Sequence, residues 1–222
     1  MNYFLKSINR LNRILRPLHR PIRNQKTLKF MSSEVSKRFN SISNMELKNS
    51  IVLDLGANRG DFSHWALHEG AIVIAFEPDK DAYLQLVKRL NKVENFFPIN
   101  TAVSNHTGLS RFYYHKHKKF DPIGFSISSS LLAEKSNLDN SSFSSVFCIN
   151  LGDIINGMSI KLIKIDIEGA EKLIWPAVKH NYKNIEYVLL EIHKLISDDL
   201  INEIELFIKQ NGLQNKWRTD WL

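Results

Sequence analysis

The stretch from Ile51 to Gly60, IVLDLGANRG, carries the clearest indication of the fold. Its apolar run, Ile51–Leu55, has the length and composition of a buried strand, and a glycine-rich turn and an amphipathic segment follow it. A second apolar run, Ala71–Phe76, ends at the acid Glu77. A buried strand, a tight turn, a helix start and a later acid are typical of the first βαβ unit of a nucleotide-binding α/β fold. The sequence therefore predicts that fold, with an adenosine-type cosubstrate at the turn.

Strands and helices alternate along the rest of the chain. Apolar runs predict strands at Ile51–Leu55, Ile72–Phe76, Phe96–Asn100, Leu162–Asp166 and Glu186–Ile192. Amphipathic segments between and after them predict helices at about Gly60–Glu69, Lys80–Lys92, Glu171–Lys179 and Asp198–Gln210. This alternation predicts a parallel sheet with helices on both faces.

A longer insert separates the third of these strands from the fourth. It contains two further predicted strands, Ser110–His115 and Val146–Asn150, with a Ser-rich stretch, Phe125–Ser145, between them. A polar loop of this length could act as a lid or face a substrate. We interpret the basic run His115–Lys119 as an exposed hairpin tip, with a metal or phosphate patch as the alternative.

The net charge of +7 is unevenly distributed over the 222 residues. Residues 1–30 contain eight basic residues and no acid, so the remaining chain is close to neutral. We interpret residues 1–30 as a basic amphipathic arm and residues 31–222 as the globular domain. The arm could pack on the domain or on a second subunit, or it could lie on an anionic membrane, with nucleic-acid phosphates as a weaker alternative.

Cysteine content and hydropathy indicate the compartment. Cys148 is the one cysteine, so no internal disulfide can form. No apolar run approaches the roughly 18–20 residues that span a bilayer, and no secretory signal peptide is visible. These features favour the cytoplasm, with peripheral membrane contact through residues 1–30.

The spacing of the glycines narrows the choice of cosubstrate. Dinucleotide-binding turns require G-x-G-x-x-G, in which the middle glycine lets the pyrophosphate approach the backbone. Here Asn58 lies where that glycine would be, between Gly56 and Gly60, and Asp54 ends the preceding strand. A carboxylate so close to the ligand repels pyrophosphate and suits a cation. The turn therefore favours a cationic cosubstrate over a dinucleotide.

A second dense motif, KLIKIDIEGAE, covers Lys161–Glu171. Its apolar strand ends at Asp166, and Glu168 follows at the start of a helix; the next strand ends near Glu191 and His193. The carboxyl ends of neighbouring parallel strands meet at one crevice, where ligands of such sheets bind. We therefore expect these four side chains to converge beside the cosubstrate.

Six segments, in this order, resemble the FkbM family of methyltransferases. They are DLGANRGDFS (54–63), AFEPD (75–79), NTAV (100–103), the serine cluster at 126–130, KIDIEGAE (164–171) and LLEIH (189–193). The resemblance implies a Rossmann-like class I methyltransferase fold: an α/β structure with a seven-stranded, mostly parallel sheet of order 3-2-1-4-5-7-6. It also implies O-methylation with S-adenosyl-L-methionine, commonly of sugars or other small-molecule hydroxyls.

The resemblance also implies roles for particular residues. Asp54 would interact with the methionine end of the cofactor, directly or through water. Glu77 would accept hydrogen bonds from the two ribose hydroxyls, and Asp166 would face the transferred methyl. The residues implied to line the cofactor site are Asp54, Gly56, Asn58, Gly60, Glu77, Pro78, Ala102 and Asp166.

Methyl transfer to a hydroxyl requires alignment of the acceptor oxygen and removal of its proton. His193 is the predicted base, since an unperturbed imidazole titrates near neutral pH, and Asp166 or Glu168 would orient the hydroxyl. Asp166, Glu191 and His193 could instead hold a divalent cation, but their spacing is no specific metal motif and no metal is expected. Glu168 and Glu171 could also simply complement the helix N-terminus.

Three functions stay open on the sequence alone. The first is an O-methyltransferase acting on a glycan or a similar small-molecule precursor. The second is a nucleic-acid methyltransferase in which residues 1–30 contact phosphates and Lys164 serves as a catalytic lysine. The third is a membrane-associated protein with a non-catalytic cofactor site, against which Asp54 and Glu77 argue.

Overall fold

The computed structural model describes residues 39, 42, 45–120, 129–134, 136–193 and 197–219. The basic arm predicted for residues 1–30 lies outside this part of the chain. Within it, no helix combines the length and the apolar character that a membrane crossing requires. The first elements are β1 (Ile51–Leu55), α3 (Asp61–His68), β2 (Ile72–Phe76), α4 (Lys80–Leu90), β3 (Phe96–Ile99) and β4 (Ala102–Ser104). Then follow β5 (Gly108–His115), β6 (Leu138–Asn150), α5 (Leu151–Ile155), β7 (Ile160–Ile165), α6 (Glu171–His180), η5 (Tyr182–Asn184), β8 (Ile185–Leu190), α7 (Asp198–Gln210) and β9 (Trp217–Arg218).

The main sheet has the order β3-β2-β1-β7-β8-β9, and every pair of neighbours is parallel. β1 lies in the middle, with Asp54 opposite Ala75 of β2 on one side and opposite Lys164 of β7 on the other. The strands are buried on both faces, which explains why their sequences are continuous Val, Ile and Leu runs. The predicted α/β class is confirmed, and all five predicted strands of this sheet are present.

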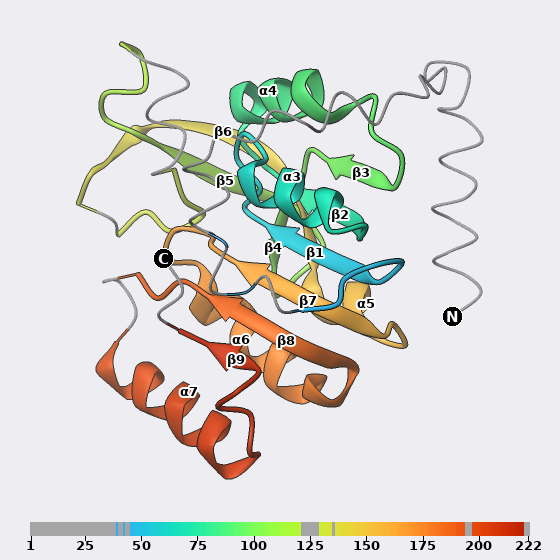
Figure 1. The fold of residues 1–222 in the computed structure, drawn as a ribbon. Coiled ribbons are helices and arrows are strands. Elements are labelled where there is room, and N and C mark those ends of the chain that lie inside the picture. Colours follow the sequence, from blue (N-terminus) through green and yellow to red (C-terminus); the bar gives the residue numbers. More distant parts are fainter. Residues whose placement is uncertain are drawn as a thin grey trace.

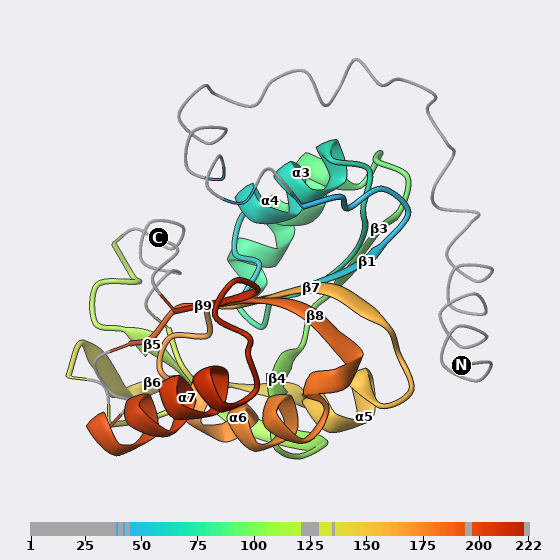
Figure 2. The same cartoon turned by 60° about the horizontal axis from the view of Figure 1, so that its bottom comes forward.

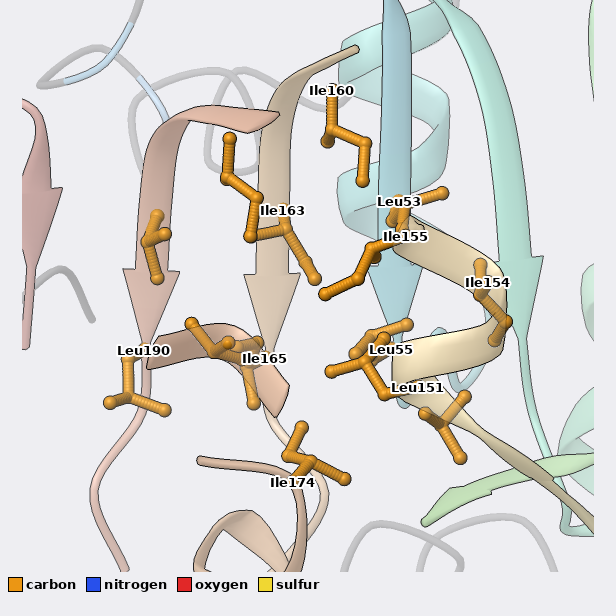
Figure 3. Packing of buried hydrophobic residues seen from close by; sticks show 14 of the residues in the cluster. Leu53, Leu55, Leu151, Ile154, Ile155, Ile160, Ile163, Ile165, Ile174 and Leu190 are labelled. Atoms are coloured by element: carbon orange, nitrogen blue, oxygen red, sulfur yellow. The ribbon is translucent and has the colours of Figure 1, made fainter. Parts of the chain in front are cut away.

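Alternate residues of each central strand enter two different cores. Val52 of β1 packs against α3 and α4, together with Leu86 and Leu90. Leu53 and Leu55 point to the opposite face and pack against α5, α6 and α7. Figure 2 shows α3 and α4 on one side of the sheet and the other three helices below it, and Figure 3 shows Leu53 and Leu55 directed at α5. The helices thus cover both faces, as the alternation of strands and helices predicted.

A separate three-stranded sheet of order β4-β6-β5 is formed by the insert. The prediction of a continuous loop over Phe125–Ser145 was wrong for its last part, because β6 begins at Leu138. Most of the added residues are serine, aspartate and asparagine, and much of their length is exposed. Backbone hydrogen bonds to β5 stabilise this half of the strand, so its side chains carry little strand signal.

The predicted strand number and order are not fully met at the β8 edge. The expected sheet had seven strands ending in the order 5-7-6, whereas the described residues form six, and the last is parallel to β8. β9 has only two residues, Trp217 and Arg218, and pairs with Val188 and Leu189. Trp217 is its one buried side chain, so the segment has little apolar surface with which to extend the sheet.

The turn after β1 positions the site, and its two glycines have different tasks. Gly56 has φ +77°, and a Cβ there would lie 1.9 Å from the carbonyl oxygen of Asp166. Gly60 has φ +84°, and a Cβ there would lie 2.4 Å from Leu86 of α4. The first glycine therefore lets the end of β7 approach the turn, and the second lets α4 approach the start of α3.

Replacing Gly56 by alanine should destabilise the fold strongly, because the overlap is with backbone and cannot be relieved by a rotamer change. Gly157 is the matched control: its φ of +74° is almost the same, but nothing lies within 4 Å of the added Cβ. Gly157→Ala should cost only the conformational penalty of about 1–2 kcal/mol. Gly56→Ala should lower the free energy of unfolding by roughly 1–3 kcal/mol more, measured by denaturant titration. Equal losses in the two variants would contradict the close approach.

Candidate functional site

The candidate site lies where the central strands end. The arrowheads of β1, β7 and β8 point toward the same edge of the sheet (Figure 1). A cavity of about 340 Å³ opens at this edge, near the lower end of the range for small-molecule sites. Its wall is formed by the turn after β1, by the residues that follow β2, β7 and β8, and by part of the insert.

Most of the residues predicted from the sequence lie in this wall. Of the predicted cofactor residues, the wall contains Gly56, Asn58, Glu77, Pro78, Ala102 and Asp166. Glu168 and Glu191 also line the cavity, as expected for the end of β7 and β8. Asp54, Gly60 and His193 do not line the cavity themselves, although Nε2 of His193 lies 3.4 Å from Glu168, which does.

Glu77 is held rigidly by the backbone. One carboxylate oxygen accepts the N–H of Asn58 at 2.7 Å, and the other accepts the N–H of Asp79 at 2.7 Å. Asn58 has φ 49°, a left-handed conformation that asparagine tolerates better than most residues. Burial raises the pKa of Glu77 to about 8, although the two N–H groups favour its ionised form. A carboxylate oxygen can accept a second hydrogen bond, so Glu77 keeps capacity for a ligand diol.

Lys164 occupies the centre of the site, and sequence reasoning had considered it only for the nucleic-acid alternative. Its buried ammonium donates to the carbonyl of Gly56 at 2.7 Å and lies 3.1 Å from Asp166 and 3.5 Å from Asp54. Burial alone would lower the pKa of Lys164, but these two acids raise it to about 12. The available signal was a lysine within the apolar run Leu162–Ile165, two residues before Asp166 and thus on the same face.

Asp54 is fully buried beneath the turn. Its Oδ2 accepts the hydroxyl hydrogen of Ser63 at 2.6 Å. Its Oδ1 has no hydrogen-bond partner within the described part of the chain, although Lys164 lies nearby. Burial raises the pKa of Asp54, and the ammonium of Lys164 opposes that shift. Asp54 is thus held by Ser63 and lies beside Lys164, and its interaction with the cofactor stays a prediction.

Glu168 has an unusual backbone conformation for a glutamate. Its φ is +58°, in the left-handed region that only glycine and, less often, asparagine adopt readily. Such strain persists only where the surrounding structure holds it, and it is concentrated at functional sites. The carboxylate of Glu168 lines the cavity and lies 3.4 Å from Nε2 of His193.

His193 is surrounded by four carboxylates. Its Nδ1 lies 2.9 Å from Glu171, whose side chain is 1% exposed and whose Oε1 also accepts the N–H of Ile167. Its Nε2 faces Asp166, Glu168 and Glu191. Burial would lower the pKa of His193, but the hydrogen bond to Glu171 and the nearby carboxylates raise it to about 9. Burial, together with Asp166, raises the pKa of Glu191 to about 7.

Lys118 connects the insert to the cofactor side of the site. It belongs to the basic run interpreted as an exposed hairpin tip, yet its side chain is only 11% exposed. Its ammonium pairs with Asp79, the N-cap of α4, and lies 4.2 Å from the centre of the Tyr114 ring. Asp79 thus fixes Glu77 with its N–H and holds the insert with its carboxylate.

The residues of the wall fit S-adenosylmethionine. Glu77 offers a preorganised carboxylate for a diol, and β1 separates it from the acids that follow β7 and β8. Of those acids, Asp166 suits the positive charge of a sulfonium. A parallel sheet of this order, a left-handed glycine turn after β1 and an acid after β2 are the features of a Rossmann-like α/β fold, which binds its ligand at the carboxyl ends of the strands.

The chain matches the model of the methyltransferase FkbM domain over residues 54–214, and it belongs to that family. Among solved structures it is similar to P. horikoshii TYW2 in complex with MeSAdo, with 29% identity over 33% of this chain and 30% of that chain and a TM-score of 0.28. It is also similar to precorrin-6y C5,15-methyltransferase from Geobacter metallireducens, with 12% identity over 87% of this chain and 82% of that chain and a TM-score of 0.42. No curated protein matches the chain.

The raised pKa of Glu77 predicts a pH-dependent contribution to stability. Because the folded state holds this proton up to about pH 8 and the unfolded state releases it near its ordinary pKa, stability should fall as the pH rises between these values. The slope from one proton is at most about 1.4 kcal/mol per pH unit. Denaturant titrations of the wild type and of Glu77→Gln should therefore differ progressively from pH 5 to pH 8.

In Glu77→Gln the side-chain NH₂ group faces a backbone N–H that the carboxylate oxygen accepts in the wild type, so one hydrogen bond is lost. The comparison of the two pH profiles is still informative. That penalty is independent of pH, so it shifts the whole curve without changing its slope. A difference between the two proteins that stays constant from pH 5 to pH 9 would show that the pKa of Glu77 is not raised.

The backbone strain at Glu168 can be measured separately from its carboxylate. Glu168→Ala and Glu168→Gly both remove the carboxylate, but only glycine relieves the positive φ. Glu168→Gly should therefore be more stable than Glu168→Ala by about 1 kcal/mol in thermal or denaturant unfolding. An alanine variant as stable as the glycine variant would exclude strain at this position.

Proposed function

We propose that this enzyme transfers a methyl group from S-adenosylmethionine to a hydroxyl of a sugar, a glycan or a similar small-molecule precursor. The observation that carries the proposal is the strained Glu168, which presents its carboxylate to the cavity beside Asp166 and Glu191. Carboxylates accept hydrogen bonds from hydroxyl groups, and several around one opening suit a polyhydroxylated acceptor.

The residues on the two sides of β1 would have different roles, one side binding the cofactor and the other facing the acceptor. Glu77 follows β2 on one side, and Asp166 and Glu168 follow β7 on the other. Glu77 would hold the ribose, which directs the reactive end of the cofactor toward Asp166. The bound cofactor supplies a methyl group on a positively charged sulfur, an electrophile that needs no further activation by the protein.

The protein then has to orient the acceptor and remove its proton. Lys164 keeps the carboxylate of Asp166 in place at 3.1 Å, so Asp166 can fix the direction of the acceptor hydroxyl. Glu168 lines the cavity and would accept the hydroxyl proton. His193, predicted as the base from the sequence, lies behind these acids and would act mainly by holding them. A base positioned in the wall needs no proton relay through His193.

The contacts of Lys164 weigh against the nucleic-acid alternative. Although Lys164 lines the cavity, its ammonium donates to Gly56 and lies 3.1 Å from Asp166, so it is engaged by the protein itself rather than left for a substrate. The wall acids would also repel the phosphates that flank a base. Together these features favour a neutral small-molecule acceptor.

Glu168→Gln should lower kcat for methyl transfer by roughly 10²–10⁴-fold, the usual contribution of a general base. The affinity for S-adenosylmethionine, measured by calorimetry, should change little, because Glu168 is not the ribose ligand. A donor with a labelled methyl group, offered with sugars, lipid-linked glycans and RNA, would identify the acceptor and supply the rate assay.

Glu205→Gln, the same change at an exposed position of α7, is the matched control and should keep the wild-type rate. Wild-type turnover in Glu168→Gln would remove Glu168 as the base. Transfer to RNA with none to hydroxylated small molecules would overturn the proposed acceptor class and favour the nucleic-acid alternative.

A further inference from the structure

Asp166, Glu191 and His193 form a compact set of potential metal ligands. Asp166 follows β7, and the other two follow the neighbouring strand β8. One ligand atom from each residue can be chosen so that all lie within 4.8 Å of one another. Nε2 of His193 lies 3.8 Å from Asp166 and 3.7 Å from Glu191. A cation with bonds of about 2.0–2.2 Å holds its ligands roughly 3–4.3 Å apart, so these separations suit one ion.

An independent feature, Glu171, fixes the direction of the imidazole. Glu171 is almost completely buried, and its Oε1 is bonded both to Nδ1 of His193 and to the N–H of Ile167. Its other oxygen is buried and has no hydrogen-bond partner in the described part of the chain. With Nδ1 engaged, Nε2 is left to face Asp166 and Glu191. A carboxylate behind the imidazole is the usual support of a metal-binding histidine.

The charges of the cluster also favour a cation. Asp166, Glu168, Glu171 and Glu191 surround His193, and Lys164 is the cation beside Asp166. Four carboxylates against two basic side chains leave an excess of negative charge in a half-buried site. Like charges this close repel one another, and a divalent ion would offset that repulsion.

We propose that Asp166, Glu191 and His193 bind a divalent cation that accepts both carboxylate and imidazole ligands, a preference that Mn²⁺ meets. The role of this cation rests on the proposed function: bound beside the cavity that Asp166 and Glu191 line, it would coordinate the acceptor hydroxyl and lower its pKa beside Glu168. Glu171 is then a positioning residue, because it acts on the cation only through His193.

The test is a titration of the chelator-treated, full-length protein with Mn²⁺, in which the electron paramagnetic resonance signal reports the free ion. Without S-adenosylmethionine, the wild type should bind one Mn²⁺ per chain. Glu191→Gln and His193→Ala should each weaken binding by at least about tenfold, and Glu171→Gln by about 10–100-fold. Glu205→Gln should bind as the wild type does. Donor calorimetry shows that the variants are folded, since none of the three replaced residues is a predicted cofactor ligand.

Two results would overturn the metal site: no Mn²⁺ binding to the wild type at millimolar concentration, or binding that Glu191→Gln and His193→Ala leave unchanged. In either case Asp166, Glu191 and His193 would form an ion-pair cluster that holds no cation. Failure here is distinguishable from failure of the proposed function. Methyl transfer to a hydroxyl in the presence of chelator would support the proposed function and exclude a role for the metal in it. Mn²⁺ binding by a protein that methylates no hydroxyl would support the metal site and overturn the proposed function.

Discussion

The site depends on one buried ammonium group. Lys164 lies between Asp54 and Asp166 and donates to the carbonyl of Gly56, so it joins β1, the turn after it and the end of β7. Two buried or half-buried acids next to each other would repel, and the loss of one partner from a buried ion pair typically costs about 3–5 kcal/mol. The same contact sets the position of Asp166 in the cavity. The contacts of Lys164 therefore both stabilise this part of the fold and set the geometry of the site.

Much of the fold could be predicted because its central strands are buried on both faces. Ile51–Leu55 and Ile72–Phe76 consist almost entirely of apolar residues, and the observed strands have these bounds. Sequence patterns were least informative where backbone pairing alone stabilises a strand. The first half of β6 is mostly polar, and β9 is two residues long, so neither carries an apolar pattern of its own. The first half of β6, in the sheet of the insert, and β9, at one edge of the main sheet, were therefore the parts that sequence patterns failed to predict.

The candidate site could be predicted as far as strand ends determine it. Glu77 and Asp166 come directly after apolar runs, and parallel strands bring such positions to one edge. The tasks of Lys164 and Glu171 could not be found in this way. Lys164 lies within a strand, and its ammonium can be buried only because the carbonyl of Gly56 and the carboxylate of Asp54 lie next to it. Glu171 was expected only to complement a helix terminus, and its hydrogen bond to His193 joins the start of α6 to the residues after β8.

The ion pair between Lys118 and Asp79 means that the insert cannot be exchanged without affecting the rest of the site. A protein engineer who wished to alter the acceptor would first consider grafting another hairpin in place of the β5–β6 connection. That graft would also remove Lys118 from Asp79, which donates its N–H to Glu77 and caps α4. The cofactor side of the site would then lose the ion pair that holds Asp79, although Lys118 is not itself predicted to contact the cofactor. A workable chimera has to bring a cation of its own to Asp79, so the modular boundary lies beyond Lys118 rather than at the end of β5.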